Sequence, residues 1–245
     1  MIPLLVRSYM NEDWPCGHGR FLTPEWLRYR IGIYLRYTVP SLLKQTDQNF
    51  RVWLDCRPGS EKELEPYMLA LEEAKVLVTF DRGAKYIHSL PGAPSHVHVM
   101  RIDSDDLYST KAVEIVRCLQ GDALAAQFYE GYIWLVPHRI LYPMRHRSPP
   151  FYCFKAEVRE DGPYIPPHQG HDSVWDTFGP EVLPGGHFCM TRHELHSGGN
   201  PLCRPYKIIK PDSDLWEDVM TRFPLEGWMG FWNDKKCNNV LKLVG

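Results

Sequence analysis

Sequence patterns typical of strands and helices alternate along the first half of this 245-residue chain. Four apolar runs rich in β-branched residues have the length and composition of buried strands: IPLLVRSY, FRVWLD, KVLVTFD and HVHVMRID. Between them, apolar residues recur at helical spacing, beginning after Thr23 and Pro24, a good N-cap and a good first helical residue. This alternation predicts an α/β fold with a mostly parallel sheet covered by helices on both faces.

Local signals predict where these helices begin and end. Pro40 is expected to kink or end the first helix before the segment SLLKQT. Ser60 and Glu63 have the spacing of a capping box at the start of a second helix. Ser109 or Thr110 is expected to cap a third helix, which precedes a new run of apolar residues at helical spacing.

The second half of the chain has a different pattern. The segments ALAAQFYEGYIWLVP and PFYCFKAE are typical of antiparallel strands, and a stretch rich in Pro, Gly and His follows. The sequence contains no linker long enough to separate two domains. We therefore expect a smaller antiparallel portion attached to the parallel sheet.

Carboxylates follow the predicted parallel strands. Asp55, Asp81 and Asp103 each end a strand, and Asp105 and Asp106 extend the last of them into the run DSDD. In open α/β sheets, ligands bind outside the carboxyl ends of the strands. Carboxylate oxygens are the ligands that Mg²⁺ and Mn²⁺ prefer, so this edge is a candidate cation site. The alternative is that these acids only cap the helix that begins near Ser109.

Composition limits the other classes of function. The net charge is −2, so no global field attracts nucleic acid. No apolar run approaches the roughly 20 residues that span a bilayer, and the N-terminal segment lacks the features of a signal peptide. The seven cysteines form no CxxC pair, which favours a reducing compartment. We expect a cytoplasmic protein, with peripheral contact at the inner face of the membrane as an open alternative.

Two segments together resemble a known family. VPSLLKQTDQNFRVWLDCRPGS resembles a segment of nucleotide-sugar glycosyltransferases with the GT-A fold, and VMRIDSDDLYS resembles their DxD motif. The form RIDSDD, with VRSY near the start of the chain, is similar to a bacterial group of rhamnosyltransferases. The resemblance covers residues 1 to about 120 and continues weakly in HELHSGGN, which has one residue more between His and Asn than the family pattern.

This resemblance implies a fold and a reaction. It implies a single GT-A-like domain over residues 1–245, with a nucleotide-sugar-binding half (1–106) and an acceptor-binding half (107–245). The implied reaction is metal-dependent, inverting transfer of a sugar, rhamnose in the most similar group, from a nucleotide diphosphate donor. The implied acceptor is a glycan or glycolipid, and the implied cation is Mn²⁺ or Mg²⁺.

The resemblance also implies roles for individual residues. Arg7 and Asp55 match residues beside the nucleotide. Asp103 and Asp105 match the DxD pair, with Asp103 nearer the ribose or sugar and Asp105 or Asp106 as the metal ligand. From the residues alone, the favoured interpretation of Asp55 is an acid that caps the turn before RPGS, and that of Arg7 is a surface residue at a strand end.

The acceptor side offers a candidate base and a candidate metal ligand. Asp172 is the candidate base, although it also has the position of a helix N-cap; Asp176 and Glu130 are reserves. The resemblance also implies His196 as a metal ligand from the second half of the chain. If its segment is a strand, His196 faces away from the two preceding histidines, His187 and His193.

Two rival functions remain open at this stage. A sugar-phosphate nucleotidyltransferase shares the expected fold, but such enzymes carry a Gly-rich basic loop after the first strand, which SYMNEDWPCGHGRF does not match well. A catalytically inactive glycan-binding module would also keep the fold. Release of nucleoside diphosphate, release of pyrophosphate, and binding without turnover distinguish the three.

Overall fold

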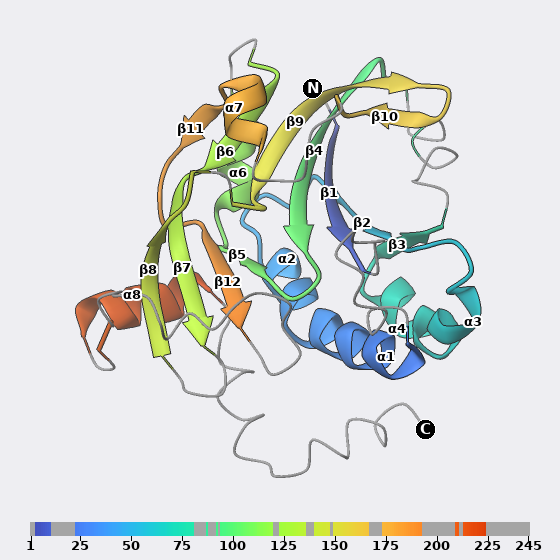
Figure 1. The fold of residues 1–245 in the computed structure, drawn as a ribbon, viewed down its shortest axis with the longest axis horizontal. Coiled ribbons are helices and arrows are strands. Elements are labelled where there is room, and N and C mark those ends of the chain that lie inside the picture. The colour runs from blue at the N-terminus through green and yellow to red at the C-terminus, as the bar shows by residue number, and fades with distance from the viewer. Residues whose placement is uncertain are drawn as a thin grey trace.

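A large mixed sheet runs through the structure and is flanked by helices, with a second sheet beside it (Figure 1). This is a computed structural model, and it describes residues 3–10, 23–80, 87, 92, 94–119, 123–135, 140–147, 149–166, 173–192, 209–210 and 213–223. Within these ranges the large sheet has eight strands in the order β11-β6-β9-β4-β1-β2-β3, with β10 paired to β9. The predicted α/β fold class is confirmed.

The four strands predicted in the first half lie parallel to one another in this sheet, with pairs β1–β2, β2–β3 and β1–β4. Their bounds are β1 Leu4–Tyr9, β2 Arg51–Asp55, β3 Val76–Thr79 and β4 His96–Asp103. Crossovers through helices keep the strands parallel, as the strand and helix alternation predicted. Asp81, expected at the end of the third strand, lies outside the described residues.

Strands of the second half extend the large sheet and build the small one. The large sheet gains β6 Ala125–Phe128, β9 Tyr152–Arg159, β10 Gly162–Tyr164 and β11 Glu181–Leu183. The small sheet has the order β5-β12-β7-β8, formed by β5 Leu107–Tyr108, β7 Glu130–Leu135, β8 Ile140–Arg145 and β12 Phe188–Arg192. The pairs β4–β9, β6–β9 and β7–β8 are antiparallel, as expected. The parallel pairs β6–β11 and β7–β12 were not foreseen.

The first helix begins as predicted but ends differently. Thr23 caps α1 (Pro24–Ile33) by accepting a hydrogen bond from the Trp26 N–H at 3.2 Å. The helix does not end before SLLKQT, because a π-helical turn, η2 (Tyr34–Thr38), leads into α2 (Val39–Leu43). A π turn is wider than an α turn, which gives room to the Pro40 ring that would otherwise meet the carbonyl four residues earlier.

The other two predicted helices begin near the expected residues, but their N-caps differ from the prediction. Ser60 precedes α3 (Glu61–Leu64), yet its hydroxyl donates to the Arg57 carbonyl at 2.5 Å instead of capping the helix. Lys111, and not Ser109 or Thr110, is the N-cap residue of the third predicted helix. The remaining bounds are η3 Glu65–Tyr67, α4 Met68–Glu73, α6 Ala112–Arg117, α7 Val174–Phe178 and α8 Asp214–Arg222.

The two faces of the parallel strands have different neighbours. Met100 and Ile102 of β4 share a buried cluster with Leu27 and Ile31 of α1, so this face is covered by helices. Alternate residues of the same strands point to the opposite face, where Val99 packs in a separate small cluster. None of the helices in the described part of the chain has the length and apolar character that crossing a bilayer requires.

Candidate active site

Strand register places charged side chains on one face, at the carboxyl ends of three neighbouring strands. Arg7 of β1 lies opposite Trp53 of β2 and Arg101 of β4. Residues in register on neighbouring strands point to the same face, and so do residues two positions further along each strand. Asp55 and Asp103 therefore share this face with both arginines, at the edge where open α/β sheets bind ligands.

Arg7 and Asp55, predicted beside a nucleotide, form a largely buried ion pair. The Arg7 guanidinium bonds to an Asp55 carboxylate oxygen, and the side chains are 13% and 11% exposed. The guanidinium carbon lies 4.6 Å from the centre of the Trp53 ring, and Trp53 is itself fixed by donating from Nε1 to Thr79 Oγ1 at 2.5 Å. Asp55 is thus held by a cation at the sheet edge and is more than a turn-capping acid.

A second pair joins Asp103 to Arg101, two residues earlier on β4. Nε and Nη2 of Arg101 donate to Asp103 Oδ1 at 3.2 and 3.1 Å, and Nη1 donates to Tyr152 Oη at 3.0 Å. The Asp103 side chain is 31% exposed, compared with 4% for Asp105. A ligand at this edge therefore reaches Asp103 most readily. Arg101 was not predicted from the sequence, although its position two residues before Asp103 places both side chains on one face.

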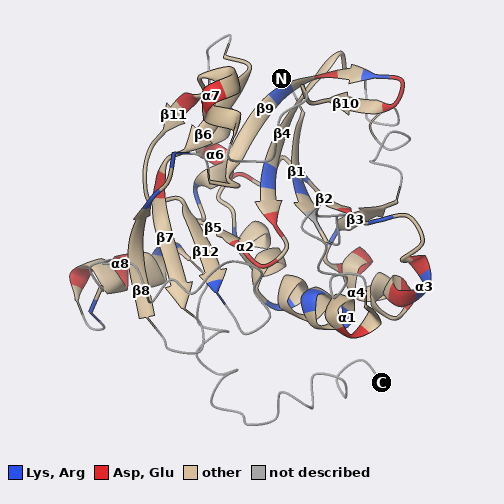
Figure 2. Cartoon of the chain, viewed as in Figure 1, with Lys and Arg blue, Asp and Glu red and all other residues tan. Residues whose placement is uncertain are grey.

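A third pair connects the turn after β4 with α1. This turn, residues 103–106, is called the DSDD turn below. Arg30 donates from Nη1 and Nη2 to the two oxygens of Asp105, both at 2.5 Å, and from Nε to Ser104 Oγ at 2.9 Å. Figure 2 shows basic segments on α1 close to the acidic turn that leaves β4.

Arg30 was missed by the sequence analysis, although its helix contains a signal for it. Leu27, Ile31 and Tyr34 are buried positions on the inner face of the first helix. Arg30 is three residues after Leu27 and four before Tyr34, so it lies on that same face. Because an arginine in such a stripe is rarely buried unless it is paired, its position predicts an acidic partner.

Asp106 fastens the DSDD turn to the small sheet. Its side chain is buried, and Oδ1 accepts a hydrogen bond from the Thr191 N–H of β12 at 2.8 Å. Thr191 Oγ1 also donates to the Asp105 carbonyl at 2.5 Å. Burial raises the pKa of Asp106 well above its ordinary value, and the nearby charges of Asp105 and Asp103 raise it further. Asp106 is therefore placed to hold the turn in position.

The residues predicted on the acceptor side are only partly described. Asp172, His193 and His196 lie outside the described residues. Asp176 of α7 pairs with Arg147 at 2.7 Å, with both side chains 67% exposed, so it belongs to a surface ion pair. Figure 1 places α7 at the end of the large sheet opposite the DSDD turn.

Two further acceptor-side residues have partners of their own. Glu130 pairs with Arg145 on the neighbouring strand at 2.7 Å. His187 Nδ1 lies 2.6 Å from Ser109 Oγ. Burial lowers the pKa of His187 to about 4, and the charges of Arg222 and Lys111 lower it further, which keeps the ring neutral at pH 7.

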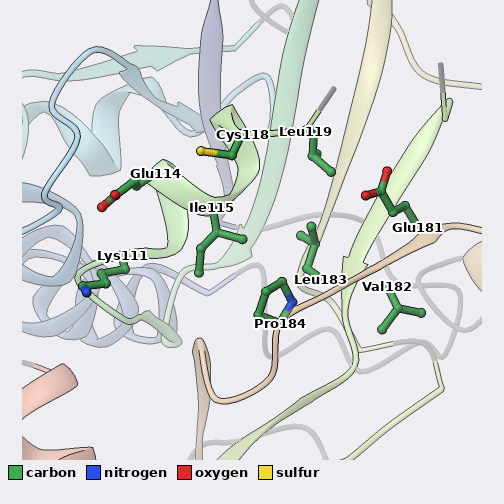
Figure 3. A pocket seen from close by; sticks show the side chains of 9 residues that line it. All are labelled: Lys111, Glu114, Ile115, Cys118, Leu119, Glu181, Val182, Leu183 and Pro184. Carbon is green, nitrogen blue, oxygen red and sulfur yellow. The ribbon is translucent and has the colours of Figure 1, made fainter. Parts of the chain in front are cut away.

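A hollow of about 320 Å³ lies elsewhere, between α6 and β11 (Figure 3). Its lining includes Lys111, Ile115 and Cys118 from the helix side and Val182 and Leu183 from the strand side. None of the predicted site residues lines it. The chemistry of the sheet edge is therefore not located in this hollow.

The chemistry of the DSDD turn suits a divalent cation, although its carboxylates have protein partners. Carboxylate oxygens are the ligands that Mg²⁺ and Mn²⁺ prefer. Within the described ranges, no group of three or more His, Cys, Asp or Glu residues is arranged to hold a metal ion. Asp103 is the accessible carboxylate, whereas both oxygens of Asp105 bind Arg30. A cation at Asp105 would therefore meet the Arg30 guanidinium on the same carboxylate.

Comparisons with known proteins give only remote structural similarity. Neither a protein-family model nor a curated protein matches the chain. A structure of S. aureus TarS 1–349 in complex with UDP is 9% identical with a TM-score of 0.40, over 78% of this chain and 61% of that one. The WbbM bifunctional glycosyltransferase is 15% identical with a TM-score of 0.29, over 52% of this chain and 23% of that one.

A third solved structure matches over a larger share of both chains. The inositol-1-phosphate CTP transferase from T. maritima is 12% identical with a TM-score of 0.41, over 91% of this chain and 96% of that one. By contrast, this chain spans less than two thirds of the TarS and WbbM chains. Similarity at this level does not extend to activity.

Proposed function

We propose that this protein is a glycosyltransferase that moves a sugar from a nucleoside diphosphate donor to a glycan or glycolipid hydroxyl. One observation carries the proposal: three Arg–Asp pairs, Arg7–Asp55, Arg101–Asp103 and Arg30–Asp105, gather at the carboxyl edge of parallel strands. Guanidinium groups suit phosphate oxygens, and carboxylates suit ribose hydroxyls or a cation. The resemblance of the RIDSDD and SLLKQT segments to GT-A glycosyltransferases supports the same assignment.

The donor would lie across the ends of β1, β2 and β4. Arg7 and Asp55 are proposed to contact the nucleotide, because their pair lies at the ends of β1 and β2 beside the Trp53 ring. Asp103 is proposed to contact the ribose or the sugar, because it is the most exposed of the three paired carboxylates. Within one domain, residues 1–106 would then bind the donor and residues 107–245 the acceptor.

The chemical step proposed is a single displacement with inversion. Mn²⁺ or Mg²⁺ held by the DSDD turn would supply Lewis-acid stabilisation of the charge on the leaving diphosphate. Asp105 or Asp106 is the proposed carboxylate ligand for it, Asp106 also being tied to the Thr191 N–H, and His196 is proposed as a further ligand. Asp172 is proposed to take the proton of the acceptor hydroxyl, and rhamnose is the sugar that the motif resemblance favours.

Release of nucleoside diphosphate from a panel of nucleotide sugars, with Mn²⁺ or Mg²⁺, tests this function. We expect turnover of one donor, and a fall in kcat/KM of about 100-fold or more for Asp103→Asn. Asp172→Asn should keep donor affinity and lower kcat by a similar or larger factor. Asp47→Asn is the matched control, because Asp47 forms an Arg–Asp pair of comparable burial with Arg117, outside the proposed site.

Other products would point to other functions. Pyrophosphate release from a nucleoside triphosphate and a sugar phosphate would identify a nucleotidyltransferase instead. Donor binding without turnover under every condition would identify a binding module. Full activity of Asp103→Asn would remove the DSDD turn from the mechanism.

A further inference from the structure

The guanidinium of Arg30 binds both carboxylate oxygens of Asp105, which are the atoms that a metal ion would bind. The two hydrogen bonds are parallel, one from each terminal nitrogen to each carboxylate oxygen, at 2.5 Å. The side chains are 13% and 4% exposed, so little solvent weakens the pair. Each carboxylate oxygen of Asp105 is therefore already bound to a cationic group.

The surroundings of the pair make it costly for a cation and Arg30 to share the Asp105 carboxylate. A divalent ion and a guanidinium bound to the same small carboxylate would repel each other strongly in a site with little water. Asp103 has its own arginine, and Asp106 is tied to Thr191. No second buried carboxylate of the DSDD turn is therefore left over for Arg30 to bind while a cation takes Asp105.

We propose that Arg30 and a divalent cation are alternative partners of Asp105, so that cation binding displaces the guanidinium from the carboxylate. The inference rests on the proposed function only in taking the DSDD turn as the cation site. Arg30 is a positioning residue in this scheme: before the cation binds, its guanidinium holds the buried carboxylate of Asp105 toward α1.

The displacement needs only a side-chain movement. The guanidinium carbon of Arg30 lies 5.5 Å from the centre of the Trp26 ring, one helical turn earlier on α1. An aromatic face is a favourable neighbour for a guanidinium that has lost its carboxylate. Ser104 Oγ, 2.9 Å from Arg30 Nε, is a second partner that does not depend on Asp105.

Mn²⁺ binding in the absence of any donor tests the proposal, measured as free Mn²⁺ by electron paramagnetic resonance. Arg30→Gln should bind Mn²⁺ more tightly than the natural protein, by on the order of tenfold, because the ion no longer competes with a guanidinium. Asp105→Asn should lose this binding. Arg28→Gln, which removes an exposed arginine of the same helix, should bind like the natural protein.

Two further measurements keep the test decisive if Arg30→Gln folds poorly. Arg30→Lys keeps the charge but loses the fork, so its Mn²⁺ affinity should fall between those of the natural protein and Arg30→Gln. In nuclear magnetic resonance, Mg²⁺ should shift the arginine Nε–H signal that Arg30→Lys removes, and Asp105→Asn should abolish the shift.

The outcomes separate this inference from the proposed function. Equal or weaker Mn²⁺ binding by Arg30→Gln and Arg30→Lys, or an Arg30 signal that Mg²⁺ leaves unmoved, overturns the inference even if the protein transfers sugars. Tighter Mn²⁺ binding by both variants supports it even if no nucleotide sugar is turned over.

Discussion

At the scale of single residues, His187 shows how the fold sets a protonation state. The pKa of its ring is lowered to about 4, from an ordinary value near 6.5, by burial and by the charges of Arg222 and Lys111. The unfolded chain therefore binds a proton below pH 6.5 that the folded chain does not bind. Stability from this group is complete above pH 6.5 and is lost as the pH falls from about 6.5 to about 4.

A substitution isolates this contribution. Between pH 7 and pH 5, His187→Asn should lose less unfolding free energy than the natural protein, by roughly 1 kcal/mol once the partial exposure of the ring is allowed for. Urea unfolding at pH 7, 6 and 5 measures the difference. His96→Gln, which changes an exposed histidine, is the control and should follow the natural protein. Parallel pH profiles for His187→Asn and the natural protein would contradict the assignment.

The carboxylates show what sequence can and cannot predict at this scale. Asp55 and Asp103 lie at the ends of parallel strands, as the apolar runs before them indicated. Their different environments depend on partners that the strand pattern does not contain. Arg30, for example, is 75 residues from Asp105 and reaches it only because α1 packs beneath β4. Local patterns located the acids, and tertiary packing determined what each acid binds.

At the scale of elements, Gln45 of the segment SLLKQT joins three pieces of structure. Its side-chain amide nitrogen donates to the carbonyls of Ser41 and Ser109 at 2.8 and 2.7 Å, and its amide oxygen accepts from the Val113 N–H at 3.0 Å. The side chain is buried, so these groups have no ready access to water. Gln45 therefore fastens the end of α2 to the start of α6 and to Ser109, the residue that follows β5.

Replacing the side-chain amide of Gln45 should lower the unfolding free energy even when the volume of the side chain is kept. Gln45→Met leaves the Val113 N–H and the Ser109 carbonyl without their partner, and we expect a loss of about 2–3 kcal/mol in unfolding free energy. Urea denaturation measures it. Gln48→Met is the control, because Gln48 is exposed and water can replace its bonds to backbone carbonyls. A loss of unfolding free energy no larger than that of Gln48→Met would contradict this stabilising role of Gln45.

The predicted ends of helices and strands agreed with the structure less closely than the predicted types of element did. Each of the four first strands is present, because a run of apolar β-branched residues has few other stable solutions in a sheet buried on both faces. The caps were less predictable, since a serine hydroxyl has several nearby acceptors. Ser60 bonds to the carbonyl of Arg57 and leaves its helix uncapped.

At the scale of the whole molecule, the two sheets share one core. The largest buried cluster contains Val6 and Met100 from the large sheet together with Ile133 and Phe188 from the small sheet. Phe188 stacks on Phe151, with ring centres 4.3 Å apart. The chain enters the small sheet directly from the DSDD turn, so a common core also fixes the geometry of the candidate active site.

The sequence did not indicate how this second sheet is assembled. Its parallel pairing of β7 with β12 brings together segments more than 50 residues apart, without a periodic pattern between them. The pairing of β7 with β12 depends on close packing between the two strands. Gly131 of β7 has no room for a side chain, since a Cβ atom there would lie 2.6 Å from the ring and the backbone of Phe188. Such close approach of two strands is a property of the assembled small sheet.

A shared core predicts that both sheets unfold together. Phe188→Ala should lower the unfolding free energy by about 3–5 kcal/mol, because it removes a fully buried ring and leaves a cavity between the sheets. Native-state hydrogen exchange measures whether Val99 in the large sheet and Ile133 in the small sheet lose protection by the same amount. Val182→Ala, at an exposed position on β11, should change neither. If Ile133 alone lost protection, the small sheet would be a separate unit, and the DSDD turn would connect two independently stable parts instead of lying within one cooperative core.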